Sequence, residues 1–186
     1  MTLLATKNIT VYGIWNTTVG GDSIAATSGT TSVGNYYPGE TPNNVFDNNT
    51  STKYTNFGAC IYAVSSTYSL QCGENTGFYF TSVEGPSLLL SVQFCTGNDN
   101  PERDPFTITI EGSNQSPSLL TLGSSWTLIY NGSTGLQSVL SRLSCGAVQP
   151  VLNNTVWYSS YRFLVTSKRD VNSGAQYSAV KLNVYL

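Results

Sequence analysis

Histidine is absent from this chain of 186 residues, and charged side chains make up only 10% of it. Histidine is the side chain most often used for proton transfer near neutral pH, and it is a common metal ligand. Its absence excludes Ser-His-Asp and Cys-His catalysis and any metal centre that needs His. Glycoside hydrolysis requires two facing carboxylates, and the sequence pairs only Glu102 and Asp104 closely. We therefore predict that the protein is not an enzyme.

Positive charge is scarce as well, with eight Lys and Arg against ten Asp and Glu, a net charge of −2. Nucleic acids and anionic membrane surfaces attract basic faces, so neither is an expected partner. Long apolar runs are also missing. Leu3-Leu4-Ala5 is too short for the core of a signal peptide, and no stretch could span a bilayer. We expect no transmembrane segment, and we expect the chain to begin after a cleavage site.

Four cysteines are present, without C-x-x-C spacing or histidine, so a zinc site is not expected. They allow three disulfide pairings, and four buried free thiols are the alternative. The chain also contains seven Asn-x-Ser/Thr sequons, which are acceptors for N-glycosylation. Together these features predict a secreted, extracellular, disulfide-bonded glycoprotein. The sequon asparagines are Asn8, Asn16, Asn48, Asn49, Asn114, Asn131 and Asn153.

Short segments rich in β-branched and aromatic residues alternate with Gly, Pro, Asn and Ser turn clusters along the whole chain. No window of a dozen residues keeps a helical period. This pattern predicts an all-β antiparallel sandwich or barrel. The segments expected to be strands are residues 8–15, 78–82, 87–95, 106–111, 126–130, 161–166 and 179–186.

Residues 1–33 are rich in Thr, Gly and Ser, and we predict that they form an N-terminal strand and linker ahead of a domain at 34–186. Two interpretations of the strand at 8–15 are open. It could be an ordinary first strand of the same sandwich. It could also be an arm that adds to the sheet of a neighbouring subunit and makes an oligomer or polymer, because main-chain pairing needs no particular side chains.

Several motifs from residue 37 to the C-terminus, with interruptions, resemble the galactose-binding-like superfamily, which includes discoidin and coagulation-factor C-type domains and similar carbohydrate-binding modules. The first is the run from Glu40 to Tyr54, continued by Thr55-Asn56-Phe57-Gly58. The second is the proline-bracketed loop around Arg103, and the third is Tyr161-Arg162-Phe163-Leu164-Val165. The resemblance implies a β-sandwich jelly roll that binds rather than catalyses.

Many relatives hold a structural calcium in the loop that corresponds here to Asn44, Asp47, Asn49 and Thr52, with oxygen ligands of the kind that Ca²⁺ prefers. The late Glu that usually completes this site falls near Ala179. The alternative is an Asx-turn in which Asp47 accepts backbone amides. The segment between residues 59 and 73 resembles an insertion. We therefore favour Cys60–Cys72 as its closing disulfide and Cys95–Cys145 as a long-range one.

Relatives recognise sugars or lipid headgroups through loops at one end of the sandwich, and sugars need aromatic platforms with nearby polar groups. The candidate ligand contacts are Tyr36, Tyr37, Asn56, Trp157 and Tyr158. Galactose-binding relatives commonly use a His, so galactose specificity is not carried over.

Arg103 has two interpretations. It could hydrogen-bond a ligand, or it could bridge Glu102, Asp104 or nearby carbonyls and so fix the loop. The leading prediction for the protein is extracellular recognition or adhesion toward glycans or glycoproteins. The alternative is a self-assembling, glycosylated structural subunit of a filament, coat or matrix.

Overall fold

The protein is almost entirely β-structure in a computed structural model that describes residues 2–4, 6, 8–62, 72–139 and 141–186. The helices in this part of the chain are all short 3₁₀ turns, namely η1 (Pro42–Phe46), η2 (Pro101–Arg103), η3 (Pro117–Leu119) and η4 (Gly123–Ser125). The strands are β1 (Thr2–Leu3), β2 (Val11–Trp15), β3 (Ile24–Ala25), β4 (Thr27–Ser28), β5 (Asn35–Tyr36), β6 (Tyr54–Asn56), β7 (Gly77–Thr81), β8 (Leu88–Phe94), β9 (Pro105–Ser113), β10 (Thr127–Ser133), β11 (Gln149–Pro150), β12 (Ser160–Lys168), β13 (Ala175–Tyr177) and β14 (Val180–Tyr185).

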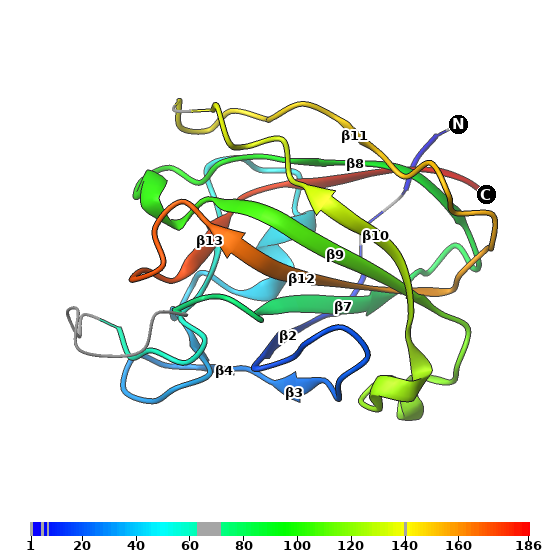
Figure 1. The fold of residues 1–186 in the computed structure, drawn as a ribbon, viewed down its shortest axis with the longest axis horizontal. Coiled ribbons are helices and arrows are strands. Elements are labelled where there is room, and N and C mark those ends of the chain that lie inside the picture. The colour runs from blue at the N-terminus through cyan, green and yellow to red at the C-terminus, as the bar shows by residue number, and fades with distance from the viewer. Residues whose placement is uncertain (1, 5, 7, 63–71, 140) are drawn as a thin grey trace.

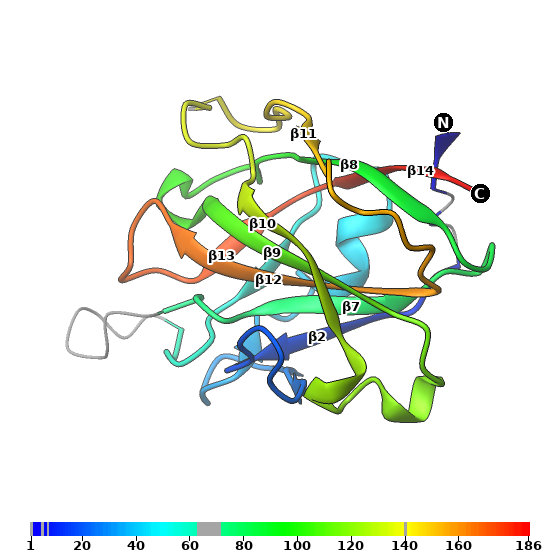
Figure 2. The ribbon, with the colours of Figure 1, turned by 45° about the vertical axis from the view of Figure 1, so that its right-hand side comes forward.

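The strands form a sandwich of two main sheets (Figure 1). One sheet has the strand order β10-β9-β12-β7-β2-β3, and the other has the order β1-β14-β8-β11. A third, smaller sheet, β13-β6-β5-β4, closes one end. The turned view separates the layer of β8 and β14 from the layer of β9, β12 and β7 (Figure 2). The antiparallel β-sandwich expected from the sequence is confirmed.

The core lies between the two main sheets and follows the period-two alternation of their strands. Phe163 of β12 faces inward and stacks on Phe78 of β7, with ring centroids 4.9 Å apart. Phe94 of β8 meets Phe163 from the opposite sheet, edge to face. Full burial of such a side chain contributes roughly 1.5–3 kcal/mol, so these rings hold the two layers together.

The N-terminal segment belongs to the sheets of its own chain. β2 pairs with β7, from Val11 opposite Phe80 to Ile14 opposite Gly77. β1 pairs with β14, and this pairing places the two termini side by side (Figure 1). The strand predicted at residues 8–15 therefore pairs within its own sandwich in this structure, as the first of the two interpretations expects. The division of the chain at residue 33 stays a prediction.

Both favoured disulfides are present, Cys60–Cys72 and Cys95–Cys145. The second joins the end of β8 to the segment that leads to β11, where Cys95 and Cys145 also form an isolated bridge. Most of the predicted insertion, residues 63–71, lies outside the described residues. Within the described part of the chain, no helix is long and apolar enough to cross a membrane.

The predicted bridge between Arg103 and an adjacent carboxylate is wrong. The carboxylate of Asp104 is fully buried and accepts two hydrogen bonds from Arg142, at 2.8 and 2.5 Å, with Arg169 at 3.5 Å. Arg103 donates its Nε to the Ser173 hydroxyl at 3.1 Å instead. The backbone is extended at Asp104, directly after η2, so the side chains of these two neighbours point in different directions.

A second buried ion pair was not predicted. Arg162 of β12 and Glu111 of β9 lie side by side on the outer face of the six-stranded sheet, and both side chains are almost fully buried. Arg162 also donates to the Gly21 carbonyl and the Ser23 hydroxyl, at 2.8 Å each. Its guanidinium lies 4.9 Å from the centre of the Trp126 ring. The pair thereby holds two loops against the sheet.

Candidate functional site

Three aromatic rings gather at the end of the sandwich away from the termini. Tyr37 follows β5, and its ring centre lies 5.1 Å from that of Tyr62 and 6.4 Å from that of Phe57. Phe57 is buried, whereas Tyr62 is 40% exposed. Phe57 therefore supports the two tyrosines from beneath, and they form the accessible part of the cluster.

A chain of contacts brings Arg103 to this same end. The loop at Gly174 lies against Phe57, since a Cβ on Gly174 would be 3.0 Å from the Phe57 Cδ1 atom. The preceding residue, Ser173, accepts the hydrogen bond from Arg103 Nε. Arg103 Nη1 and Nη2 make no hydrogen bond with any described residue and remain available as donors. We call Tyr37, Tyr62 and Arg103 the loop-end site.

The loops at this end are braced by a buried lysine. Lys53 Nζ lies 2.5 Å from Asp99 Oδ1 and 3.4 Å from Glu40 Oε1, so it ties the segment after η1 to the loop before η2. Partial burial of Asp99 acts to raise its pKa. The hydrogen bond and positive charge of Lys53, a hydrogen bond from Gln176 and the charge of Arg103 together outweigh this, and the net effect is a lowered pKa for this carboxyl. Asp99 is therefore ionised at neutral pH, and its ion pair with Lys53 holds both loops in place.

The structure separates the other predicted ligand residues. Asn56 is buried, its amide donates to the Ile14 carbonyl and the Tyr54 hydroxyl, and it accepts from Gly58 N. Because its side chain is buried and hydrogen-bonded to groups inside the protein, Asn56 has a structural role and is not a ligand contact. Tyr36 is partly buried and packs edge-on against Tyr54.

Trp157 and Tyr158 lie at the opposite end of the molecule from Arg103. They precede β12, whose nine residues span roughly 30 Å, while Arg103 lies near its far end. Tyr158 is buried against Gly112 and Tyr161, which removes it from the accessible surface. Trp157 is exposed, and its carbonyl accepts from the Asn114 amide at 2.8 Å.

The Asp47 loop gathers three of the four predicted calcium ligands. Asp47 Oδ2 lies 2.5 Å from the Thr52 hydroxyl, which is also 2.8 Å from the Asn49 carbonyl. Asp47 Oδ1 accepts from the Asn49 amide at 2.8 Å, the geometry expected of the Asx-turn. The fourth predicted ligand is the backbone carbonyl of Asn44, whose side chain donates to the carbonyls of Gly39 and Lys53.

These three oxygens fit one side of a calcium shell, but they supply a single carboxylate. Among the described residues, no three His, Cys, Asp or Glu side chains gather as a metal-binding group. Calcium at this loop therefore stays a prediction, for a weak site. A bound ion would hold the loop between η1 and β6 in one conformation.

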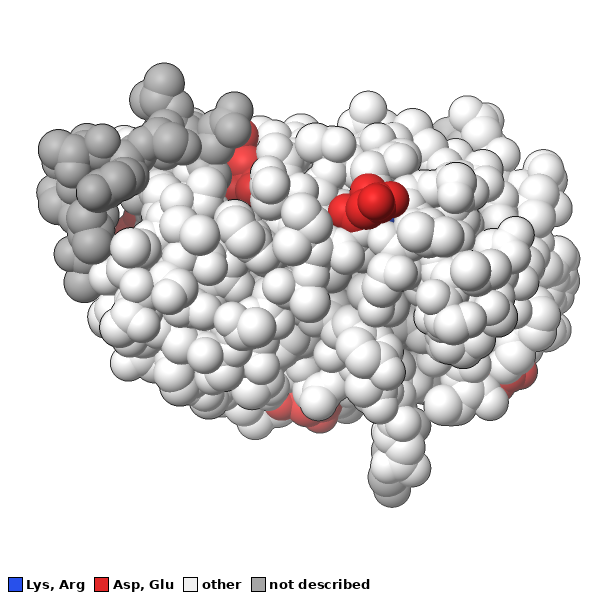
Figure 3. Space-filling view, turned by 90° about the horizontal axis from the view of Figure 1, so that it is seen from below, with Lys and Arg blue, Asp and Glu red and all other residues white. Residues whose placement is uncertain are grey.

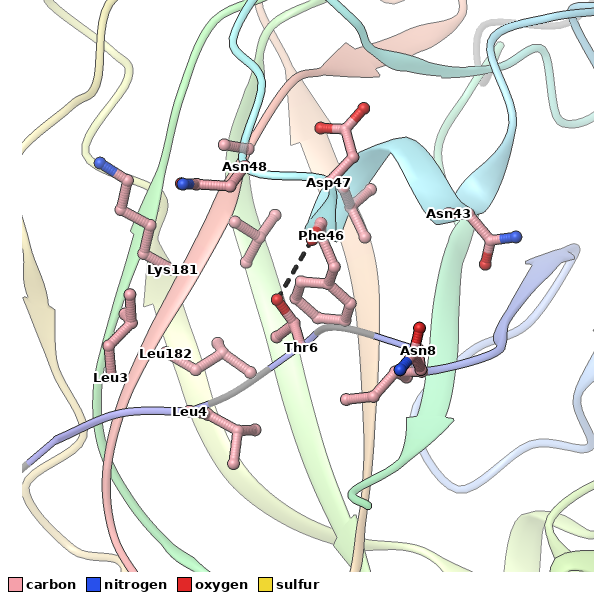
Figure 4. Close-up of a pocket in the computed structure, with 14 residues that line it drawn as sticks. Leu3, Leu4, Thr6, Asn8, Asn43, Phe46, Asp47, Asn48, Lys181 and Leu182 are labelled. Carbon is pink, nitrogen blue, oxygen red and sulfur yellow. Dashed lines mark hydrogen bonds between the residues drawn. The ribbon is translucent and has the colours of Figure 1, made fainter. Parts of the chain in front are cut away.

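A groove of about 690 Å³ lies beside the Asp47 loop. Figure 4 shows Leu3, Leu4 and Leu182 along one side, with Asp47 at the rim. The Thr6 hydroxyl donates to the Phe46 carbonyl across it at 3.2 Å. Its walls are mainly aliphatic, which is unlike the aromatic platform and polar groups that bind sugars.

No family model and no curated protein matches the sequence. Solved structures do match, and they are carbohydrate-binding modules. The CBM32-1 and CBM32-2 domains of Clostridium perfringens ZmpB match with a TM-score of 0.60 and 11% identity, over 97% of this chain and 35% of that one. The chain thus spans about a third of that structure.

Two single modules from Clostridium perfringens match over nearly their whole length. One is CBM32-3 of a family 31 glycoside hydrolase, with a TM-score of 0.59, 12% identity, and coverage of 98% of this chain and 95% of that one. The other is the family 32 module of NanJ in complex with galactose, with a TM-score of 0.55, 9% identity and 97% coverage of both chains. The protein therefore has the β-sandwich fold of these modules, and the fold implied by the resemblance in its sequence is confirmed.

Proposed function

We propose that this protein is a non-catalytic, extracellular glycan-binding module that binds sugar at the loop-end site. The observation that carries the proposal is that the Tyr37–Tyr62 ring pair and Arg103 lie at the same braced end of the sandwich, connected through Phe57, Gly174 and Ser173. Aromatic rings pack against the apolar face of a sugar, and guanidinium N–H groups donate to its hydroxyls. Both kinds of contact are available here.

The structural neighbours support this class of ligand. The NanJ module is in complex with galactose, and a ZmpB structure is in complex with GalNAc. This chain has no histidine, so its sugar must be recognised by other donors. We propose that Arg103 supplies them, and that the natural partners are glycans or glycoproteins.

The absence of catalysis is supported by the way the acidic residues are used. Glu111 and Asp104 are buried in ion pairs with arginines, and Asp99 is engaged by Lys53. These carboxylates hold the structure together, so they are not free to act as an acid and a nucleophile on a sugar.

An extracellular setting is supported by the two disulfides, which persist in oxidising compartments. It is also supported by the position of the sequons, since the side chains of all seven sequon asparagines are exposed. We propose that some of them carry glycans.

A glycan array tests the function. The wild-type protein, Tyr37→Ala and Arg103→Gln would be compared with Tyr185→Ala, which removes an exposed tyrosine beside the termini. One lost sugar–aromatic contact of about 1.4 kcal/mol corresponds to a roughly tenfold weaker affinity. We expect that loss for Tyr37→Ala and Arg103→Gln and none for Tyr185→Ala. An equal signal from all four proteins would refute the loop-end site.

A further inference from the structure

A second groove, of about 320 Å³, lies on the outer face of the six-stranded sheet, along β2. Tyr12 of β2 stands directly opposite Tyr79 of β7 in the antiparallel register. Their rings are nearly parallel, with centroids 5.0 Å apart and planes at 18°. Both rings line the groove, which we call the sheet groove. It is separate from the loop-end site.

The free face of Tyr12 makes this pair unlike an ordinary structural one. A cross-strand tyrosine pair often serves only to stabilise a sheet. Stacking on Tyr79 covers one face of the Tyr12 ring, yet the side chain is 51% exposed, so the other face is open to solvent. The Tyr79 ring also packs edge-on against Trp126, with ring centroids 5.9 Å apart. Packing against Trp126 therefore supports the tyrosine pair, while the Tyr12 ring stays accessible to a ligand.

The groove exists because of a glycine and a short neighbouring strand. β3 pairs with β2 only at Ile14 and Trp15, so none of the described strands covers the edge of β2 at Tyr12. At Gly13, a Cβ would lie 2.7 Å from both Pro42 Cγ and the Tyr54 hydroxyl. The absence of this carbon lets η1 approach β2 closely and form the opposite wall.

Polar groups with unused hydrogen-bonding capacity surround this platform. Asn43 uses its Oδ1 to accept from Val11 N at 3.0 Å, and its Nδ2 makes no hydrogen bond within the described structure. The same holds for the hydroxyls of Tyr36 and Thr121, which also line the groove. An aromatic floor with neutral donors and acceptors at the rim is the arrangement that recognises sugars.

The charge of this face restricts the ligand. Figure 3 views the molecule from below, the side on which β2, β3 and β4 lie, and shows no Lys or Arg on it and only a few acidic patches. Arg162 lies beneath this face but is buried in its ion pair with Glu111. Five further basic side chains are engaged with groups inside the protein, namely Lys53, Arg103, Arg142, Lys168 and Arg169. Anionic ligands would find no counter-charge here.

We propose that the sheet groove is a second binding site, for uncharged oligosaccharides, in which a sugar ring stacks on Tyr12 and hydrogen-bonds Asn43 Nδ2. The inference deepens the proposed glycan-binding function but does not use the loop-end site. A chain with both sites holds a glycan at two places, and binding at two linked sites is tighter than at either alone.

Affinity electrophoresis in gels containing a neutral polysaccharide (galactomannan, xyloglucan or mixed-linkage β-glucan) tests the proposal, with polygalacturonate as the charged comparison. The variants are Tyr12→Ala, which removes the platform, and Ala25→Arg, which fills the groove from an exposed lining position and keeps the tyrosine pair. Tyr37→Ala reports on the loop-end site, and Leu128→Ala is a matched surface control.

We expect at least one neutral polysaccharide to retard the wild type, and both groove variants to bind it about tenfold more weakly. We expect Tyr37→Ala and Leu128→Ala to bind the neutral polysaccharide through the sheet groove as the wild type does. We expect polygalacturonate to gain no retardation from the sheet groove, so that the wild type and Tyr12→Ala migrate alike in it. Unchanged retardation of Ala25→Arg and Tyr12→Ala would overturn the sheet groove while leaving the loop-end site standing. Failure of every neutral polysaccharide to retard the wild type would overturn it as well, whereas the glycan array separately decides the loop-end site.

Discussion

Arg162 Nε lies 2.7 Å from Glu111 Oε2, and both side chains are almost completely removed from solvent. The second carboxylate oxygen, Oε1, accepts from the Gly20 amide at 2.9 Å. A buried ion pair of this kind offsets a large desolvation cost only while both partners are present. It fixes the loop around residues 20–23 over the outer face of the sheet, next to the sheet groove.

Glu111→Gln should therefore be strongly destabilising, because it leaves the Arg162 charge buried without a counter-charge. We expect a loss of about 3–5 kcal/mol in the free energy of unfolding, which lowers Tm by roughly 6–20 °C in a domain of this size. Calorimetry measures both. The double variant Glu111→Leu/Arg162→Met should lie closer to the wild type, and a double variant worse than the single one would contradict this account.

The two disulfides should contribute unequally. They join residues 12 and 50 positions apart, and the chain-entropy model assigns about 3 kcal/mol to the shorter loop and about 4 kcal/mol to the longer one. We expect Cys95→Ala/Cys145→Ala to lower the urea midpoint more than Cys60→Ala/Cys72→Ala does. The reverse order would show that strain or packing outweighs loop closure.

Lys168 should make stability rise with pH in mildly alkaline solution. Burial lowers its pKa to about 8 from 10.5, and the carboxylates of Glu74 and Asp170 only partly oppose this. Between these two values the unfolded chain binds more protons than the folded one, so the free energy of unfolding increases as the pH rises. The penalty for burying the charged amine is fully present below pH 8.

An NMR titration of the lysine Cε signals should find that Lys168 has a pKa of about 8, well below the usual lysine value of 10.5. Lys168→Met should remove the alkaline rise from a plot of unfolding free energy against pH. A Lys168 midpoint near 10.5 would contradict the prediction.

Calcium should bind weakly at the Asp47 loop. A site with one carboxylate belongs with extracellular modules whose Kd is roughly 10⁻⁴–10⁻³ M. At about ten times Kd, binding stabilises the fold by about 1.4 kcal/mol, or roughly 3–5 °C in Tm. Asp47→Asn should abolish the calcium-dependent shift and should not respond to EDTA. A wild-type Tm that is the same in calcium and in EDTA would show that the loop acts only as an Asx-turn.

Much of the fold could be predicted from the sequence, because β-sandwich strands alternate with a period of two and end at recognisable turns. The motif from Glu40 to Tyr54 and the closing run around Arg162 were sufficient to predict the fold that the matching modules share. The partner of Asp104 could not be predicted, because Arg142 and Arg169 are 38 and 65 positions away along the chain and no local pattern marks such a contact.

The candidate sites could be predicted only in part from the sequence, because they too depend on contacts between residues that are far apart along the chain. Tyr37 and Arg103 were each singled out by their local context, but only the folded loops show that Phe57, Ser173 and Gly174 connect them. Tyr12 and Tyr79 were missed because they are 67 positions apart and become neighbours through strand register. The one available signal was a tyrosine at an outward position of each strand.

The pairing of Thr2 with Val184 has a consequence for how the protein could be built into larger architectures. Polypeptide joined to either end would leave from one and the same corner, remote from Tyr37. A host protein could thus display the sandwich on a single stalk, or carry it as an insertion within a surface turn, with the loop-end site directed outward in both arrangements.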